Sequence, residues 1–175
     1  WNAVVHDARR IPEIARRAIR EALSGRPGPV HLDIPQDVLD QRCRYSESEF
    51  DLTPARYRFT GRIRPDADGV ARAVDVLADA RRPLIVAGGG VIASEAGEQI
   101  RQLAARLRCP VVPTQMALGV VSSDSPHFIG HGGLIAGPPI REAFAEADVI
   151  LSVGCRWSSW MWDEHGPLAR RTHRT

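Results

Sequence analysis

Lysine does not occur in this 175-residue sequence, so all 23 basic residues are arginines. They nearly balance the 21 acidic residues, and no basic stripe is interleaved with aromatic side chains. This pattern argues against a nucleic-acid partner. Long apolar runs are also missing, and none approaches the ~20 residues needed to span a bilayer. We therefore expect no membrane partner.

Cysteine is scarce as well. Cys43, Cys109 and Cys155 are odd in number and far apart, and no C-x-x-C pair occurs. This spacing argues against a disulfide framework and against a zinc site. Cys109 and Cys155 flank apolar runs, where cysteine behaves as a small core residue. Since no signal-peptide pattern is visible either, we expect a reducing, cytoplasmic location and no metal ligands.

Strands and helices alternate through the second half of the chain. Apolar runs predict strands over 84–87, 110–114 and 148–153, and periodic segments predict helices over 94–107 and 139–146. Strands that are apolar throughout are typical of a parallel sheet covered on both faces. The sequence therefore predicts an α/β fold with a doubly wound parallel sheet, Rossmann-like in its arrangement.

The first part of the chain follows a different pattern. An amphipathic helix is expected over 11–24 and a short strand over 28–35. Residues 1–40 are therefore expected to be the C-terminal helix and strand of an upstream domain, and residues 41–65 a linker. Residues 66–175 are expected to form a partial domain, truncated at its C-terminal end because no apolar run follows the last strand.

A glycine-rich turn lies between the first predicted strand of this domain and the next helix. Gly88, Gly90 and Ala93 satisfy the pattern G-x-G-x-x-G/A. In that setting glycines let the backbone approach a pyrophosphate at a helix N-terminus, although they also simply turn a chain. Thr114 and Gln115 stand where an NAD-binding domain carries an acid. This argues against NAD and leaves FAD, ADP or no nucleotide.

Several stretches, taken together and in order, resemble thiamine-diphosphate-dependent enzymes of the acetolactate synthase type. They are GRPGPVHLDIPQDV (25–38), RPLIVAGGGV (82–91), CPVVPTQMALG (109–119), HFIGHGG (127–133) and ADVILSVGCRW (147–157). By this resemblance the first stretch ends the family's pyrimidine-binding domain, and the others belong to its central domain.

The resemblance also implies a function for a longer parent protein. In the family, a glutamate of the first domain activates thiamine, and a GDG…N motif of the third domain holds diphosphate and magnesium. Neither occurs in this sequence. The resemblance thus implies a transferase or lyase acting on 2-oxoacids, with thiamine diphosphate and Mg²⁺ bound outside this chain. The chain alone is expected to be inactive and to contain no catalytic residue. Its expected partners are the parent's other domains and further copies in a homo-oligomer.

The central domain of such enzymes receives the ADP part of FAD in some members, ADP in others, and nothing in the rest. By resemblance, the cofactor-binding candidates are Gly88, Gly89, Gly90, Thr114, Gln115, Gly130, Gly133 and Arg156. Flavin-containing members continue G-x-R-F-D-D-R, whereas residues 154–160 here read GCRWSSW. Arg156 is kept, but the two acids and the second arginine are not. We therefore expect no retained FAD and weak ADP binding at best.

Two other interpretations remain open at this point. One is a free-standing nucleotide-binding module of the sirtuin-like or electron-transfer-flavoprotein type, whose sheets are similar. A sirtuin would need its own catalytic histidine and usually zinc cysteines, and this sequence shows neither feature. The other is a structural interaction domain. Trp157, Trp160 and Trp162, just past the last strand, suit either a flat ligand or a subunit contact.

Overall fold

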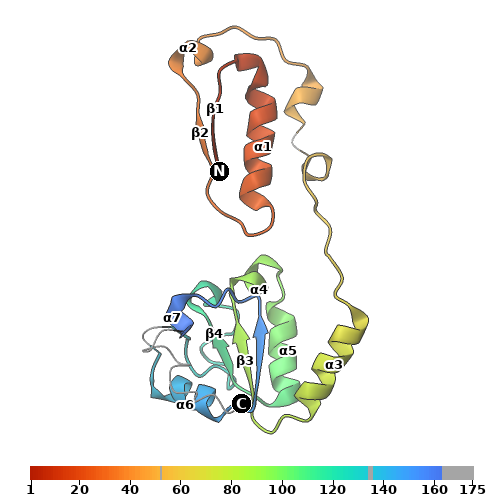
Figure 1. The fold of residues 1–175 in the computed structure, drawn as a ribbon, viewed down its shortest axis with the longest axis vertical. Helices are drawn as coiled ribbons and strands as arrows, with labels where there is room; N and C mark the ends of the chain where they lie inside the picture. Colours follow the sequence, from red (N-terminus) through yellow and green to blue (C-terminus); the bar gives the residue numbers. More distant parts are fainter. Residues whose placement is uncertain (52, 134–135, 163–175) are drawn as a thin grey trace. The chain divides into compact units, whose positions relative to one another are not determined.

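The computed structural model of the protein describes residues 1–51, 53–133 and 136–162 (Figure 1). The chain divides into two compact units, Trp1–Arg64 and Pro65–Thr175. Each unit is described by itself below. None of the described helices is both long enough and apolar enough to cross a membrane.

The first unit contains helix α1 (Ile11–Leu23), which connects two short strands along the chain and lies beside them (Figure 1). Pro12 lies in the first turn of α1, where its missing N–H leaves no hydrogen bond unmade. Glu13, also in that turn, favours the helix N-terminus electrostatically. Gly25 follows the helix at a φ of +61°, a conformation that suits glycine and ends the helix. The helix predicted over 11–24 is therefore confirmed.

Strand β1 (Asn2–Val4) pairs in parallel with β2 (His31–Asp33). The strand predicted over 28–35 is thus only three residues long. Pro29 and Pro35 on either side lack a backbone N–H for a ladder, which limits its length. Helix α2 (Gln36–Leu39) begins directly after Pro35. The core of the unit consists of Val5, Ala8, Ile14 and Val38.

Part of the predicted linker packs onto this first unit. The 3₁₀ helices η1 (Ala8–Arg10), η2 (Glu47–Phe50) and η3 (Pro54–Arg56) are its remaining short elements. The Tyr45 hydroxyl donates to the Ala8 carbonyl at 2.7 Å. The Tyr45 and Phe50 rings meet edge to face, with their centroids 5.1 Å apart. Residues 41–50 therefore add to the packing of the first unit.

The second unit is built on a parallel sheet. Strands β3 (Pro83–Ala87), β4 (Val111–Pro113) and β5 (Val149–Val153) lie in the order β4-β3-β5, and both pairings are parallel. The parallel neighbours predicted from the sequence are confirmed. In the described part of the chain β5 pairs with β3 alone. The segment 168–175, where no further strand is expected, lies outside the described residues.

Helices cover both faces of this sheet, as Figure 1 shows. Helix α5 (Gly97–Leu107) packs on one face and helix α6 (Pro138–Glu146) on the other. The α5-side cluster includes Ile85, Ala87, Ile100, Ala104 and Val111. The α6-side cluster includes Leu84, Val86, Val112, Ile140, Phe144 and Met161. Alternate residues of β3 thus face opposite sides, and the doubly wound α/β fold is confirmed.

The helix predicted over 94–107 is confirmed as α5 apart from its first residues, and the structure adds a short helix before it. Helix α4 (Gly89–Ala93) begins directly after the strand, and α5 starts only at Gly97. Between them Glu95 has a φ of +55°, and the Ala96 N–H donates to the Val91 carbonyl at 2.9 Å. This left-handed residue closes α4 in the manner of a helix C-terminus. The glycine turn is therefore followed by a helix of only five residues.

Three further helical elements belong to the described part of the second unit. Helix α3 (Ala67–Ala78) begins at Asp66, whose carboxylate accepts a hydrogen bond from the Gly69 N–H at 2.7 Å. It contains no buried residue. The 3₁₀ helix η4 (Gln115–Ala117) follows β4, and helix α7 (Ser159–Trp162) is the last described element.

Candidate functional site

Six of the eight residues predicted to bind a cofactor follow the carboxyl ends of parallel strands, and Gly130 and Gly133 lie in a loop segment. Gly88–Gly90 follow β3, Thr114 and Gln115 follow β4, and Arg156 lies three residues beyond β5. Thr114 pairs in parallel with Gly132, which places the segment 130–133 beside the end of β4. Because the strands are parallel, these turns gather at one edge of the sheet, where open α/β sheets bind ligands.

The N–H groups of two of the glycines are already engaged within the protein. The Gly88 N–H donates to the Val153 carbonyl at 2.8 Å, and the Gly90 N–H donates to the Gly154 carbonyl at 3.1 Å. A Cβ atom on Gly88 would overlap the backbone of Gly154 and Cys155. One on Gly90 would lie 2.8 Å from the Gly154 Cα. These glycines let the turn after β3 touch the turn after β5.

Gly154 completes this contact from the other strand. It has a φ of +63°, and a Cβ atom there would lie 2.8 Å from the Gly90 Cα and from the Val91 N. We call Gly88, Gly90 and Gly154 the glycine clasp. Sequence reasoning singled out the first two as phosphate-binding candidates and missed the third. The only available signal was a glycine immediately after the last apolar strand.

Gly89 and the turn after β4 have different surroundings. A Cβ atom on Gly89 would lie 3.2 Å from the Met116 Cβ, in a contact between α4 and η4. The Thr114 N–H donates to the Ala87 carbonyl at 2.8 Å and extends the β3–β4 pairing. Gln115 and Met116 are exposed. The accessible part of the edge therefore includes Gly89, the η4 turn and the exposed Gly154, whereas Gly88 is buried.

Arg156 stands between two residues that pack inward. Cys155 Sγ lies 3.3 Å from the Val86 carbonyl oxygen, and burial raises the pKa of the Cys155 thiol. Trp157 packs against the α6-side cluster and has a φ of +54°. Arg156 itself is exposed. The side chains of Trp160 and Trp162 lie outside the described part of the chain.

His131, in the segment beside β4, has an unsatisfied polar atom. Its Nδ1 is buried and has no hydrogen-bond partner within the described part of the chain. Such an atom costs about 1–3 kcal/mol unless a water or ligand completes it.

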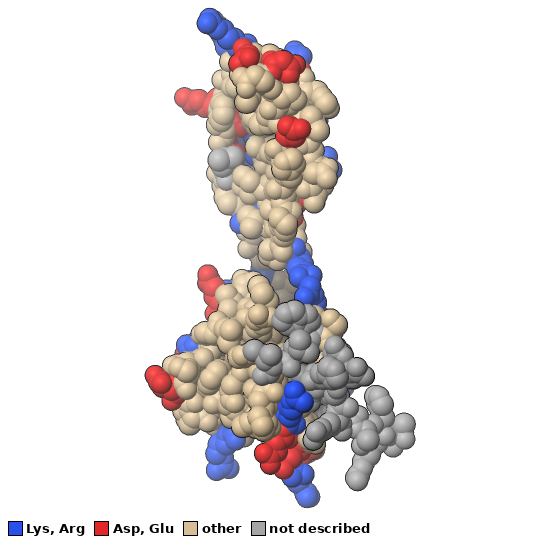
Figure 2. Space-filling model, turned by 90° about the vertical axis from the view of Figure 1, so that its left-hand side faces the viewer, with Lys and Arg blue, Asp and Glu red and all other residues tan. Residues whose placement is uncertain are grey.

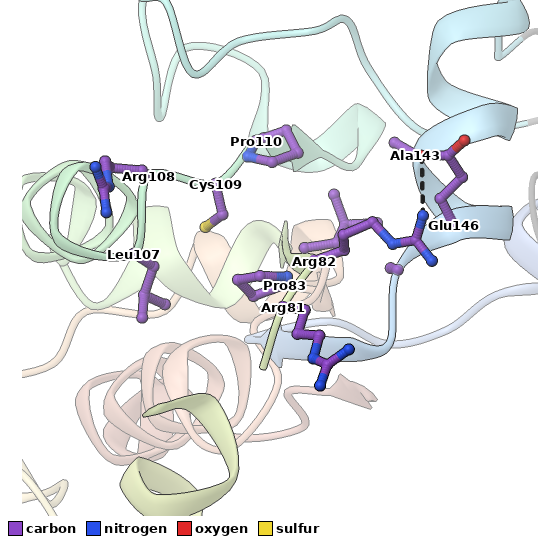
Figure 3. Close-up of a pocket in the computed structure, with 11 residues that line it drawn as sticks. Arg81, Arg82, Pro83, Leu107, Arg108, Cys109, Pro110, Ala143 and Glu146 are labelled. Atoms are coloured by element: carbon purple, nitrogen blue, oxygen red, sulfur yellow. Dashed lines mark ion pairs between the residues drawn. The ribbon is translucent and has the colours of Figure 1, made fainter. Parts of the chain in front are cut away.

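A pocket of about 290 Å³ lies at the opposite, amino-terminal edge of the sheet (Figure 3). Arg82 Nη1 lies 3.9 Å from Glu146 Oε2, and Figure 3 shows the side chains of Arg81 and Arg108 pointing in other directions. The Asp148 carboxylate accepts hydrogen bonds from the Arg81 and Arg82 N–H groups at 2.7 and 2.9 Å. The arginines therefore do not converge on an anion.

The cysteines and the other metal-ligating side chains of the described residues offer no second site of this kind. Cys43, Cys109 and Cys155 are free thiols. Burial raises the pKa of Cys109 to about 11, so its thiol stays protonated and unreactive near neutral pH. Among the described residues, no group of three or more His, Cys, Asp or Glu side chains is arranged to hold a metal ion. Figure 2 shows basic and acidic side chains close together on the face it presents.

Comparisons with known proteins agree with one another. Residues 70–172 match a family described as thiamine pyrophosphate enzyme, central domain. The chain is 38% identical over 156 residues to a probable acetolactate synthase large subunit of Methanococcus aeolicus, covering 85% of this chain and 25% of that protein. It is 33% identical over 178 residues to an acetolactate synthase of Mycobacterium bovis, covering 98% of this chain and 28% of that protein.

A relative with a different named activity is similarly close. A probable 2-ketoarginine decarboxylase of Pseudomonas aeruginosa, AruI, is 34% identical over 170 residues, covering 97% of this chain and 29% of that protein. The chain thus spans between a quarter and a third of the length of these curated relatives.

Proposed function

This chain belongs to the family of thiamine pyrophosphate enzymes, whose central domain it matches, and we propose that it is part of a longer enzyme acting on 2-oxoacids. The proposed reaction is that of an acetolactate-synthase-like transferase or a lyase. The names of its relatives support this choice, since they include acetolactate synthases and a 2-ketoarginine decarboxylase. The free-standing nucleotide-binding module is not favoured, because the matched family is an enzyme domain.

In this proposal the chain itself performs no chemical step. Thiamine diphosphate, held with Mg²⁺ by other parts of the parent, supplies the carbanion chemistry that such enzymes use. The absence of a GDG motif from the 175 residues supports this division of labour. The parent's other domains and further copies of the parent are the proposed partners, and the cytoplasm is the proposed location.

An assay of 2-oxoacid consumption tests whether the chain alone performs no chemical step. We expect the parent protein, with thiamine diphosphate and Mg²⁺, to consume pyruvate or another 2-oxoacid. The isolated chain should consume none under the same conditions. Turnover by the isolated chain would contradict the proposal.

We further propose that the carboxyl edge of the second unit receives the diphosphate of a nucleotide, ADP in particular. The observation that carries this proposal is the exposed Arg156 at an edge shared with Gly89, Thr114, Gln115 and the segment 130–133. Arginine can bind a phosphate through two charge-assisted hydrogen bonds. Gly88 and Gly90 would form the floor of the site and contribute shape, since their N–H groups are engaged. Gly130 serves packing in this proposal, because a Cβ atom there would lie 2.8 Å from Ile140 Cδ1 in the α6-side cluster.

Calorimetric titration tests the nucleotide proposal. We expect ADP to bind with a Kd on the order of 0.1–1 mM, because a shallow site with one arginine offers few contacts. Arg156→Ala should weaken this binding. The purified chain should show no flavin absorbance, since the acids and second arginine of flavin-containing members are replaced. Stoichiometric FAD in the purified protein would contradict this expectation.

A further inference from the structure

Trp157 has a left-handed backbone conformation, with a φ of +54°, although it does not lie at the C-terminus of a helix. Three described non-glycine residues have a positive φ: Glu95, Arg108 and Trp157. Glu95 follows the C-cap of α4, and Arg108 is the C-cap of α5, where left-handed residues are common. Trp157 ends no helix, and a bulky side chain is unfavourable in this region. Such an outlier is a reason to look for a role at that position.

The left-handed Trp157 lies in a segment whose residues alternate between half-buried and exposed. Cys155 and Trp157 both pack against the α6-side cluster, and Cys155 Sγ also approaches the Val86 carbonyl. Arg156, between them, is exposed. Further along, Met161 is buried, with its Sδ 3.3 Å from the position that a Cβ atom on Gly132 would occupy. The segment is thus attached to the domain on both sides of Arg156.

We propose that Trp157 is a positioning residue, which holds Arg156 at the carboxyl edge for the phosphate or diphosphate of a ligand. This inference rests on the nucleotide site proposed above. An arginine on a freely moving loop loses conformational entropy when it binds an anion. Anchors on both sides of Arg156 reduce that loss, because the backbone is already fixed before the ligand arrives.

The test compares three ligands on variants of the whole 175-residue chain. ADP and inorganic pyrophosphate carry the proposed anionic group, whereas adenosine does not. We expect Trp157→Ala and Arg156→Ala each to weaken the binding of ADP and of pyrophosphate about tenfold. This is the effect expected for loss of a charge-assisted contact. Adenosine binding should not change. The double variant should bind no more weakly than Arg156→Ala alone, because the two residues act as one unit.

Trp157→Phe is the matched control, since it keeps an aromatic ring for the α6-side cluster. It should retain ADP affinity within about twofold, because apolar replacements of similar shape disturb packing least. Thermal unfolding checks that each variant is folded. If Trp157→Ala does not fold, Trp157→Leu serves in its place, because it removes the ring and keeps an apolar side chain.

The outcomes separate the two proposals. If Trp157→Ala binds ADP as tightly as the unchanged chain, the positioning role is overturned while the nucleotide site stands. If pyrophosphate binds in a manner dependent on Arg156 and Trp157 but ADP does not bind, the nucleotide proposal fails and the positioning role is supported. If the unchanged chain binds neither anion, both proposals are overturned.

Discussion

Glycine residues at the carboxyl edge show how a short motif can serve packing. In the glycine clasp, two N–H groups of the motif donate to carbonyls at the end of β5, and missing Cβ atoms let two backbones touch. The local sequence reveals the G-x-G pattern but not its partner, because Gly154 lies 64 positions after Gly90 and meets it only in the folded sheet. The same pattern therefore fits a phosphate turn and a packing turn equally well when read alone.

The clasp predicts that its members tolerate alanine poorly. Gly88→Ala would place a Cβ atom inside the backbone of the turn after β5, and Gly154→Ala would strain a left-handed residue. We expect each to lower the free energy of unfolding by more than about 2 kcal/mol, a value typical of core overpacking or backbone strain. Urea unfolding measures this change.

Gly89→Ala is the matched control for the clasp. It lies in helix α4, and its Cβ atom would approach the exposed Met116 at 3.2 Å. We expect a change within about 1 kcal/mol, because alanine also favours the helix over glycine. Equal stability of Gly88→Ala and Gly89→Ala would disprove the structural role of the clasp.

At the scale of elements, the strands of the second unit were predictable from the sequence. The break between α4 and α5 and the short strand β1 were not. Strands β3 and β4 are apolar on both faces and β5 is apolar except at Ser152, so their runs of valine, isoleucine and leucine identify them directly. The break between α4 and α5 depends on the left-handed φ of Glu95, which no periodic pattern encodes. Strand β1 has only three residues and pairs with a strand far along the chain, so it gives no local signal.

The packing of α6 on the sheet predicts a large cost for removing its central side chain. Phe144 is fully buried in the α6-side cluster. We expect Phe144→Ala to lower the free energy of unfolding by about 3–5 kcal/mol, since it leaves a cavity. Val74→Ala on α3 is the control, because Val74 is 57% exposed and should cost well under about 1 kcal/mol. Chemical unfolding of the two variants measures the difference, and similar losses would contradict the assigned core.

The start of β5 predicts a pH dependence of stability. Hydrogen bonds from the backbone N–H groups of Arg81 and Arg82 hold the pKa of Asp148 below its usual value. A carboxyl with a lowered folded pKa stabilises the protein above its unfolded pKa, and that contribution is lost as pH falls through the folded pKa. Asp148→Asn should therefore be less stable than the unchanged chain at pH 7. The difference should shrink below the unfolded pKa of about 4.

Unfolding free energies of the two proteins, measured from pH 7 down to the lowest pH at which both still fold, check this dependence. A stability difference that stays constant across the acid range would show that the Asp148 hydrogen bonds do not depend on its charge.

At the scale of the whole molecule, the order of several motifs along the chain indicated the protein family. The resemblance to enzymes of the acetolactate synthase type is confirmed by the family match and by the named relatives. Parallel topology explains why most candidate site residues could be predicted as a group, since six of the eight follow the carboxyl end of a strand. Which N–H groups remain available to a ligand could not be predicted, because it depends on hydrogen bonds between distant turns.

The central claim is that this chain is a domain of a thiamine-diphosphate-dependent enzyme and carries none of the groups that hold that cofactor. Calorimetric titration of the 175-residue chain with thiamine diphosphate and Mg²⁺ tests it most directly. We expect no heat of binding at cofactor concentrations up to about 1 mM. A Kd of that size corresponds to a binding free energy of roughly −4 kcal/mol. Binding with micromolar affinity would contradict it.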